Sequence, residues 1–479
     1  MTVEYDLVVI GGGSAGLVAA SAGAQLNARV ALVEKHLLGG DCLHYGCVPS
    51  KSMIHAAQIA HNVKTASRFG IYTSEPKINF AEALNHVQGV VSTIQEHDST
   101  ERFEALGVDV IYGAGKFIDD HTFEVSGRQL RGRNFLISTG SRPAIPPVKG
   151  LKEAGFLTNE QVFSLKERPA SLAVIGAGPI GCELGQSFAR LGSEVTIIAS
   201  RDQIMPKEDP EAAAVVRKQL ESEGIRILTN SRAQQVEVID GKKHLRVGDK
   251  DSSETIVVDE ILVSTGRVPN VESLGLEAAG VEVGKAGIRV NEKLQTSTKH
   301  IYGAGDVIGG YQFTHVAGYE GAVVIQNALF MPTKKADYRV IPWATFTEPE
   351  LARVGLTEQQ ARDRYGDDVA VLRQDFSGVD RALAEAAGYG FAKIITRSNG
   401  EILGAHIVGL HAGELIHEVV LAMGNNLKID AIKAIIHVYP TLSEVTAKAA
   451  LQLTKQKYAK NDRLQTILRR FFNWRRSLV

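Results

Sequence analysis

Cys42 and Cys47, two of the three cysteines, lie in the segment Gly39–Lys51, which reads GGDCLHYGCVPSK. The Cys-x4-Cys spacing can bridge the irregular first turn of a helix, where the helix dipole and free amide groups also favour a thiolate. Zinc is the main rival, but the sequence has no second cysteine pair, and His411 and His417 are badly spaced for a zinc motif. The pair therefore predicts a redox centre, and we expect no metal site.

A glycine-rich loop follows the first strand-like run, YDLVVI, and opens a helix from about Ser14. Its pattern, Gly11-x-Gly13-x-x-Gly16, is the dinucleotide fingerprint, which allows a tight turn, a close approach of the backbone to a pyrophosphate, and packing of the helix on the strand. Glu34 ends the next strand, where a carboxylate accepts hydrogen bonds from an adenosine ribose 2′-hydroxyl. We therefore expect a dinucleotide with a free ribose hydroxyl at this loop.

The same loop recurs 165 residues later, as Gly176-x-Gly178-x-x-Gly181 after the strand-like run SLAVI. The strand end that corresponds to the ribose-binding acid carries Ala199, and Arg201 follows it. An arginine there suits a ribose 2′-phosphate, so we expect NADP; if Arg201 is only a solvated surface charge, the site takes NAD. Two nucleotide sites of different type imply a flavin in one and a nicotinamide in the other, because hydride must pass between two carriers.

The elements that position these motifs alternate between strand-like and helical runs, which is typical of parallel, doubly wound sheets. From Arg339 to Val445 the pattern changes to mixed strands followed by helices, which indicates a separate α+β domain. A last helical segment closes the chain. With 479 residues, 44% of them hydrophobic and 22% charged, the composition is that of a globular protein with several domains and excludes a disordered chain.

Charge separates the last part of the chain from the rest. The net charge of −1 creates no field that favours nucleic acid, so we expect no such partner. Residues 451–479, however, contain eight basic residues and one acid, Asp462. This tail has the pattern of an amphipathic helix, which can bind an anionic membrane or a protein partner, or can pack on its own domain. The uncharged run Leu7–Ala28 is glycine-rich and lacks a basic leader, so we expect no targeting segment and a cytoplasmic protein.

Six motifs occur in a fixed order along the chain: GGGSAG, GGDCLHYGCVPSK, STG, GAGPIGCE, STGRVPN and GAGDV. By these motifs, residues 3–450 resemble the flavin-dependent pyridine nucleotide–disulfide oxidoreductases, the family of glutathione reductase, dihydrolipoyl dehydrogenase and mercuric reductase. The resemblance implies FAD, a nicotinamide nucleotide, a homodimer, and an α/β fold with two Rossmann-like dinucleotide-binding domains and a C-terminal α+β dimerisation domain. The implied parts are the FAD domain (1–148 and 270–337), the NAD(P) domain (149–269), the dimerisation domain (338–450) and a basic amphipathic C-terminal helix (451–479).

The resemblance also implies roles for individual residues. Cys42 would be the interchange thiol that meets the substrate, and Cys47 would be the thiol against the flavin. Lys51 would lie near flavin N5, paired with Glu183, and Asp306 would bind the ribityl chain. The implied cofactor-binding positions further include Ser14, Gly40, Asp41, Gly115, Thr139 and Gly140, and Gly266 and Arg267 along the nicotinamide nucleotide.

The C-terminal acid departs from the family pattern. Disulfide-reducing members carry a His-Pro-Thr segment with a glutamate five residues after the histidine, a pair that protonates the leaving thiol across the dimer. Here Tyr439 stands at the histidine position, Glu444 is kept, and His437 lies two residues upstream. A phenol with a pKa of about 10 is a poorer acid–base catalyst near neutral pH than an imidazole with a pKa near 6.5. We therefore expect slow reduction of ordinary disulfides, unless His437 takes the role.

We thus predict an enzyme that passes electrons from NADPH through FAD and a Cys42–Cys47 disulfide to a disulfide or another soft, small-molecule acceptor. The chain resembles mercuric reductase but lacks that enzyme's C-terminal cysteine pair, since no cysteine follows Cys182. One alternative is a disulfide reductase of the dihydrolipoyl dehydrogenase or glutathione reductase type that uses NAD(H). An alternative of another class is a redox-sensing flavoprotein that docks through its basic tail.

Overall fold

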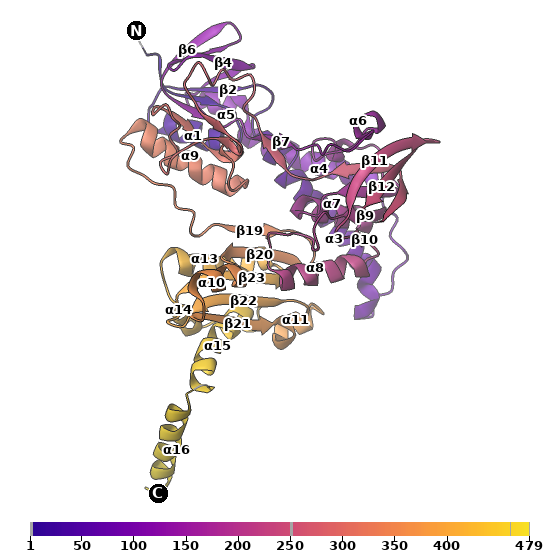
Figure 1. The fold of residues 1–479 in the computed structure, drawn as a ribbon, viewed down its shortest axis with the longest axis vertical. Coiled ribbons are helices and arrows are strands. Elements are labelled where there is room, and N and C mark those ends of the chain that lie inside the picture. The colour runs from indigo at the N-terminus through magenta and orange to yellow at the C-terminus, as the bar shows by residue number, and fades with distance from the viewer. Residues whose placement is uncertain (1–2, 250–251, 460, 479) are drawn as a thin grey trace. The chain divides into compact units, whose positions relative to one another are not determined.

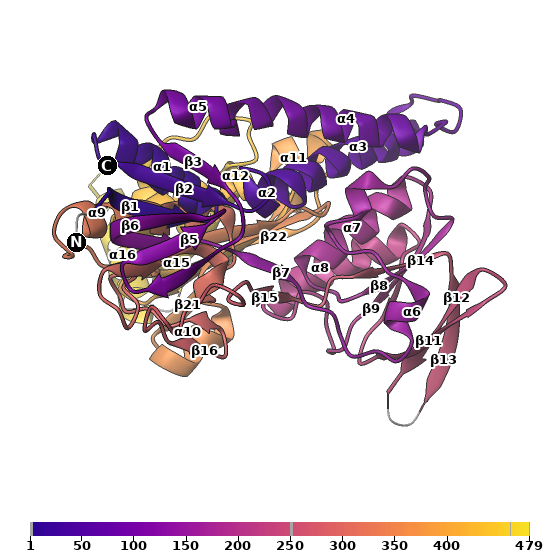
Figure 2. The same cartoon turned by 90° about the horizontal axis from the view of Figure 1, so that it is seen from above.

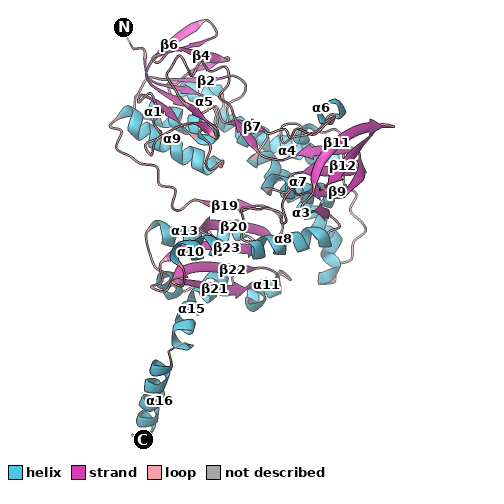
Figure 3. Ribbon diagram, viewed as in Figure 1, coloured by secondary structure: helices cyan, strands magenta, loops and turns pink. Residues whose placement is uncertain are grey.

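The computed structural model describes residues 3–249, 252–459 and 461–478. The chain forms two compact units, one of residues 1–200 and 224–337 and the other of residues 201–223 and 338–479. Each unit combines helices with sheets (Figures 1 and 3). The predicted fold class, α/β with a C-terminal α+β domain, is confirmed.

The first unit contains a parallel sheet extended by antiparallel strands, in the order β3-β2-β1-β6-β5-β4, with β18 paired to β6. The central strands are almost fully buried, as uninterrupted apolar runs covered on both faces require. Helices α1 and α9 pack against each other beside this sheet, and α3 and α4 lie side by side (Figure 2). The strands are β1 (Tyr5–Ile10), β2 (Val30–Glu34), β3 (Asp109–Tyr112), β4 (Gly115–Asp119), β5 (Thr122–Val125), β6 (Arg128–Ile137) and β18 (Ile301–Gly303).

A second parallel sheet in this unit has the order β10-β9-β8-β14, and a three-stranded antiparallel sheet, β11-β12-β13, accompanies it. Strands β7 and β15 form a short antiparallel pair on the two stretches of chain that connect the parallel sheets. The strands are β7 (Ser141–Pro143), β8 (Ser171–Ile175), β9 (Glu194–Ile198), β10 (Arg226–Leu228), β11 (Arg232–Ile239), β12 (Lys242–Gly248), β13 (Ser253–Val258), β14 (Glu260–Val263), β15 (Arg267–Pro269), β16 (Val283–Gly284) and β17 (Gly287–Ile288). The helices of the unit are α1 (Ser14–Gln25), α2 (Gly40–His44), α3 (Cys47–Thr65), α4 (Phe80–Gln95), α5 (Thr100–Ala105), α6 (Leu151–Ala154), α7 (Pro179–Arg190) and α9 (Thr314–Leu329).

The second unit is built on an antiparallel sheet in the order β19-β20-β23-β22-β21. Its core is formed by the apolar face of this sheet and by α13, α14 and α15. The strands are β19 (Pro342–Thr345), β20 (Glu350–Gly355), β21 (Val369–Asp375), β22 (Phe391–Arg397) and β23 (Ile402–Gly409). The helices are α8 (Pro210–Ser222), α10 (Glu358–Tyr365), α11 (Asp380–Ala384), α12 (Ala412–Leu415), α13 (His417–Gly424), α14 (Ile429–Ala434), α15 (Glu444–Ala459) and α16 (Asp462–Arg476). Within the described ranges, we find no helix with the length and apolarity needed to cross a bilayer.

A buried lysine fastens α8 to this C-terminal sheet, a contact that the sequence did not suggest. Asp209 caps α8 by accepting hydrogen bonds from the backbone N–H groups of the helix's first turn. Lys393 of β22 donates to both Asp209 oxygens, at 3.1 and 3.2 Å, and to Glu211 at 2.9 Å. Both Lys393 and Asp209 are buried, so each needs the other to offset its lost hydration.

Lys393→Met should therefore lower the free energy of unfolding by about 3 kcal/mol, because it leaves the Asp209 carboxylate buried without its lysine. Calorimetric or fluorescence-detected thermal unfolding measures the change. The matched control is Arg217→Met, which removes an exposed pair with Glu221 and should cost less than about 0.5 kcal/mol. Equal losses of unfolding free energy in the two variants would contradict a stabilising role for the buried Lys393–Asp209 pair.

Candidate active site

The two thiols are brought together by the start of a long helix. Cys42 lies in α2, and Cys47 is the first residue of α3, with the turn at Gly46 between them. Both are free thiols in this structure, Cys42 half-buried and Cys47 exposed. The Sγ atom of Cys47 lies 3.3 Å from the hydroxyl of Thr314, the first residue of α9. A thiol at this position receives the positive end of the α3 dipole, as the spacing predicts.

The surroundings give the two thiols opposite pKa shifts. A hydrogen bond from Cys42, the Thr314 hydroxyl and the charge of Lys51 together lower the pKa of Cys47 to about 6, against the opposing effects of burial and of the Glu183 charge. The same hydrogen bond, together with burial, raises the pKa of Cys42 above its ordinary value. The reduced pair therefore carries its negative charge on Cys47 and its proton on Cys42. Cys182 is fully buried, and burial raises its pKa to about 12.

One ion pair connects the cysteine helix to the second nucleotide domain. The Nζ atom of Lys51 on α3 donates to Oε2 of Glu183 on α7 at 2.8 Å. The Glu183 side chain is only 6% exposed, whereas that of Lys51 is 36% exposed. The carboxylate thus fixes an ammonium group one helical turn from Cys47 while leaving it accessible to a ligand.

The first glycine loop has the form that a pyrophosphate site requires. Gly11 has a φ of +107°, and a Cβ atom there would lie 2.5 Å from the carbonyl oxygen of Ser138. At Gly13, by contrast, a Cβ atom would meet only open space. Gly13 is also the N-cap of α1, which begins at Ser14 without a side-chain cap. The first backbone N–H groups of α1 therefore remain available to bind an anion.

Glu34 lies at the end of β2 directly beside this loop. Its carboxylate accepts hydrogen bonds from the backbone N–H of Gly12 at 2.7 Å and of His36 at 2.8 Å. The side chain is buried, and each carboxylate oxygen has capacity for one further donor. These contacts orient the acid where an adenosine ribose would pair with it.

The second loop repeats this geometry. Gly176 has a φ of +116°, and a Cβ atom there would lie 2.5 Å from the carbonyl oxygen of Ser264. The Ser264 hydroxyl donates to the Gly176 carbonyl at 2.9 Å, and the Ser138 hydroxyl donates to the Gly11 carbonyl at the same distance. The serine hydroxyl of each Ser-Thr-Gly motif therefore stabilises the turn of one glycine loop.

The other residues of the second loop also match those of the first. Gly178 again faces open space and starts α7 without a side-chain cap, and Gly181 packs against the Gly176 carbonyl. Ala199, buried, follows β9 in place of an acid, and the exposed Arg201 comes two residues later in the chain.

Two acids expected at the flavin are joined by one arginine. Arg267 Nη2 lies 3.1 Å from Asp41, and its Nε atom lies 3.5 Å from Asp306. Ser141 donates to Asp306 at 2.5 Å and accepts from Arg267 at 2.6 Å. Burial raises the pKa of Asp306, although Ser141 and Arg267 oppose the shift. Arg267 thus bridges Asp41 and Asp306.

The remaining predicted cofactor residues take several positions. A Cβ atom at Gly40 would lie 2.9 Å from the Gly13 Cα atom, so α2 starts against the first loop. The Thr139 hydroxyl donates a hydrogen bond to the backbone carbonyl of Asn270 at 2.7 Å. Gly140, with a φ of +69°, and Gly266, with a φ of +140°, would each direct a Cβ atom into open space. Gly115 lies in β4, where a Cβ atom would clash with Phe123, so sheet packing alone accounts for it.

The C-terminal acid–base candidates are held by different partners in the second unit. The Tyr439 hydroxyl donates to Asp380 at 2.8 Å, which raises the pKa of this exposed phenol. His437 Nε2 lies 2.8 Å from Glu418, and the imidazole is largely buried. Glu444 keeps one carboxylate oxygen buried without a hydrogen-bond partner. The structure therefore pairs neither Tyr439 nor His437 with Glu444.

Several residues of the site carried no signal in the sequence. Thr314 contacts Cys47, and Asn159 donates to Asp41 at 3.2 Å and to the carbonyl of Tyr45 at 3.0 Å. Asn159 lies more than a hundred residues from the cysteine segment. No local pattern marks such a residue, because only the packing of the domains creates the contact.

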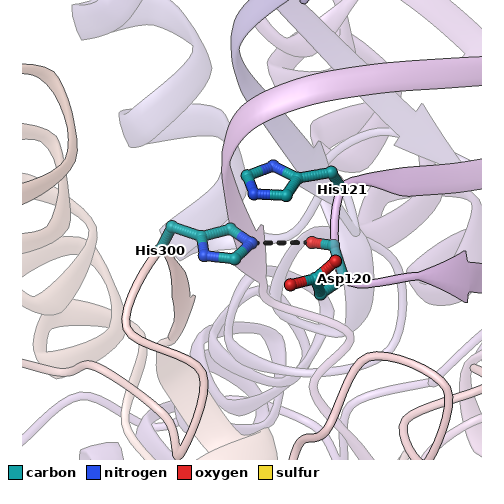
Figure 4. Close-up of side chains that lie close together, drawn as sticks. All are labelled: Asp120, His121 and His300. Atoms are coloured by element: carbon teal, nitrogen blue, oxygen red, sulfur yellow. Dashed lines mark hydrogen bonds between the residues drawn. The ribbon is translucent and has the colours of Figure 1, made fainter. Parts of the chain in front are cut away.

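Asp120, His121 and His300 form a cluster with metal-binding chemistry in the first unit (Figure 4). The two imidazoles stack with their centroids 3.9 Å apart and their planes 2° from parallel. His300 Nε2 bonds the Asp120 carbonyl at 2.8 Å, and His121 Nδ1 bonds the Gly132 carbonyl at 3.0 Å. Imidazole lone pairs lie in the ring plane, so parallel rings do not direct them to one ion. We infer that the side chains of this cluster stabilise the turns in which they lie and do not form a metal site.

Comparisons with known proteins agree with this geometry. The family model described as pyridine nucleotide-disulphide oxidoreductase matches residues 5–321, and the model of its dimerisation domain matches residues 341–450. Mercuric reductase of Staphylococcus aureus is 38% identical over 454 residues, which cover 94% of this chain and 83% of that protein. Dihydrolipoyl dehydrogenase of Thermus scotoductus is also 38% identical, over 94% of this chain and 98% of that protein.

A solved structure with the same fold is the HOCl-induced flavoprotein disulfide reductase RclA from Escherichia coli, with a TM-score of 0.82 and 29% identity. The match covers 92% of this chain and 98% of that one. A copper(II) complex of RclA gives a TM-score of 0.84 at 28% identity, with 94% and 100% covered. The expected enzyme class and its cofactors, FAD and a nicotinamide nucleotide, are confirmed, and the chain belongs to the pyridine nucleotide-disulphide oxidoreductase family.

Proposed function

We propose that this enzyme carries an electron pair from NADPH to a soft electrophile, with a thiophilic metal ion as the favoured acceptor. Bound FAD would accept hydride from the nicotinamide and pass the electron pair to a Cys42–Cys47 disulfide. The observation that carries the proposal is the pair of free thiols at the start of α3 beside the Lys51–Glu183 ion pair, where the surroundings shift the two thiol pKa values in opposite directions. Steady-state NADPH oxidation against a panel of metal ions, quinones and disulfides tests it.

The proposed roles follow from the charges around each thiol. Cys47 holds a thiolate because Cys42, Thr314 and the Lys51 ammonium stabilise its charge. Reduction of the disulfide takes two electrons and two protons, or one proton when Cys47 remains a thiolate. Cys42 retains the proton and would meet the acceptor. The first glycine loop with Glu34 would hold FAD, and Arg267 would position Asp306 for the ribityl chain.

A metal acceptor suits this chain because Cys42 then needs no general base to remove its proton. A soft cation that binds Cys42 displaces the proton itself, since coordinated thiols are deprotonated outright. A disulfide acceptor instead needs an acid for the leaving thiol, and Tyr439 is occupied with Asp380. The relatives called mercuric reductase and the copper(II) complex of RclA support the same choice.

A disulfide reductase is the second candidate, and one observation favours it. His437 is held by Glu418, so the chain keeps a carboxylate–imidazole pair near the position that the family uses. The third candidate, a redox sensor, would show little turnover with any acceptor. For each, we propose a homodimer, because the chain contains the family's dimerisation domain, and we also propose a cytoplasmic location. We also propose that the C-terminal tail makes a further contact.

The first expectation here concerns the nicotinamide nucleotide. NADPH should reduce the enzyme with a kcat/KM at least tenfold above that of NADH, because Ala199 offers no ribose-binding acid and Arg201 offers a phosphate-binding fork. Arg201→Ala should lose most of its NADPH efficiency and keep its NADH efficiency. Stopped-flow reduction with both nucleotides measures this, and equal efficiencies in the wild type would refute it.

Cys47 should react with iodoacetamide half-maximally near pH 6 in the reduced protein, since only the thiolate is nucleophilic. Lys51→Met should move this midpoint upward, because it removes a stabilising positive charge. Fragmentation of the labelled peptides in mass spectrometry separates Cys47 from Cys42, and the buried Cys182 serves as the unreactive control. A midpoint that stays near that of a free thiol would exclude the proposed charge distribution.

Tyr439→His should raise turnover with lipoamide or glutathione disulfide by about 10²-fold, the lower range of general acid–base catalysis, and leave flavin reduction by NADPH unchanged. Turnover with metal ions should change little. His437→Ala is the companion variant. Fast native disulfide turnover that disappears in His437→Ala would show that His437 is the acid and that a disulfide is the acceptor.

A further inference from the structure

The last helix has two sharply different faces. Helix α16 begins after Asn461, whose side chain accepts a hydrogen bond from the backbone N–H of Leu464 at 2.9 Å. At about 100° per residue, one continuous arc of about 160° carries the large apolar side chains. These are Leu464, Ile467, Leu468, Phe471, Phe472 and Trp474. The opposite arc carries Arg463, Arg469, Arg470 and Arg476 together with Asp462 and neutral polar residues.

The apolar arc lies open to water in this structure. Ile467 is 62% exposed, Phe471 44%, Phe472 48% and Trp474 58%. In Figure 1 the helix extends beyond α15 and away from the sheet of its own unit. The sequence alone allowed this helix to pack on its own domain, but the structure leaves every one of its side chains exposed or half-buried. An apolar surface of this kind is typical of a binding face.

The charges on α16 and its position in the chain indicate which partner covers its apolar arc. The helix contains five arginines and one acid, Asp462, and arginines stand at both borders of the apolar arc. There their apolar stems can lie along a hydrocarbon surface while their guanidinium groups bind phosphates. The helix also lies beyond residue 450, where the match to the dimerisation domain ends, so the family's dimer contact does not account for it.

We propose that α16 binds flat on the surface of an anionic bilayer, with its aromatic arc among the acyl chains and its arginines on the lipid phosphates. Its 15 residues extend about 22 Å, which is less than the roughly 30 Å of a hydrocarbon core, so it lies in the interface. Arg475 stands within the apolar arc, near the end of the helix, where its long side chain can reach the headgroups. The docking is independent of which acceptor the enzyme reduces.

Flotation of the full-length, FAD-loaded enzyme with vesicles tests this proposal. The enzyme should bind vesicles of phosphatidylcholine with phosphatidylglycerol at least tenfold better than vesicles of phosphatidylcholine alone, and 0.5 M salt should weaken the binding. Phe471→Ser/Trp474→Ser and Arg469→Glu/Arg470→Glu should each lose it by at least tenfold. NADPH oxidation with a soluble acceptor should be unchanged in both variants, which separates docking from folding and catalysis.

Matched controls come from exposed positions elsewhere. Tyr72→Ser removes an aromatic side chain that is 85% exposed, and Lys152→Glu/Lys166→Glu reverses two surface charges; both variants should still bind. Failure of the wild type to bind anionic vesicles would overturn the proposal. A dimer that dissociates in Phe471→Ser/Trp474→Ser, without vesicle binding by the wild type, would show instead that a second copy of the chain covers the face.

Discussion

The ion pair between Lys51 and Glu183 joins α3, the helix that begins at Cys47, to α7, and it holds one of the charges that lower the pKa of Cys47. Glu183 is buried and therefore needs its lysine, while Lys51 remains partly open toward the cysteines. The pair fixes a positive charge beside Cys47 without burying that charge completely. Helices α3 and α7 pack against each other around this contact.

The two nucleotide sites use the same backbone geometry and differ in one side chain. In each, a glycine with positive φ allows the chain to turn. The hydroxyl of a nearby serine donates a hydrogen bond to the carbonyl of that glycine. A second glycine then faces open space at an uncapped helix start, where backbone amides can bind a phosphate. The difference lies at the next strand end, which carries Glu34 in one site and Ala199 in the other. The two loops thus differ at the following strand end and not in the loop itself.

In the C-terminal unit, the three acid–base candidates have separate surroundings. With tyrosine at position 439, the hydroxyl reaches Asp380, His437 pairs with Glu418, and Glu444 retains an unpaired buried oxygen. The same unit also includes α8, held by Lys393, and the exposed helix α16. The match to the family's dimerisation domain covers residues 341–450 of this unit and ends before α16.

The sequence by itself determined the enzyme family, the α/β class, both cofactors and the candidate thiols, because each follows from residues that are close in the chain. A glycine loop, a strand-end acid and a Cys-x4-Cys segment are local patterns with a local physical cause. Only the tertiary structure showed that Thr314 contacts Cys47, that Asn159 holds Asp41, that Arg267 joins two acids, and that α8 packs on the C-terminal sheet. These contacts join residues far apart in the chain, so they arise from packing, which no local pattern records.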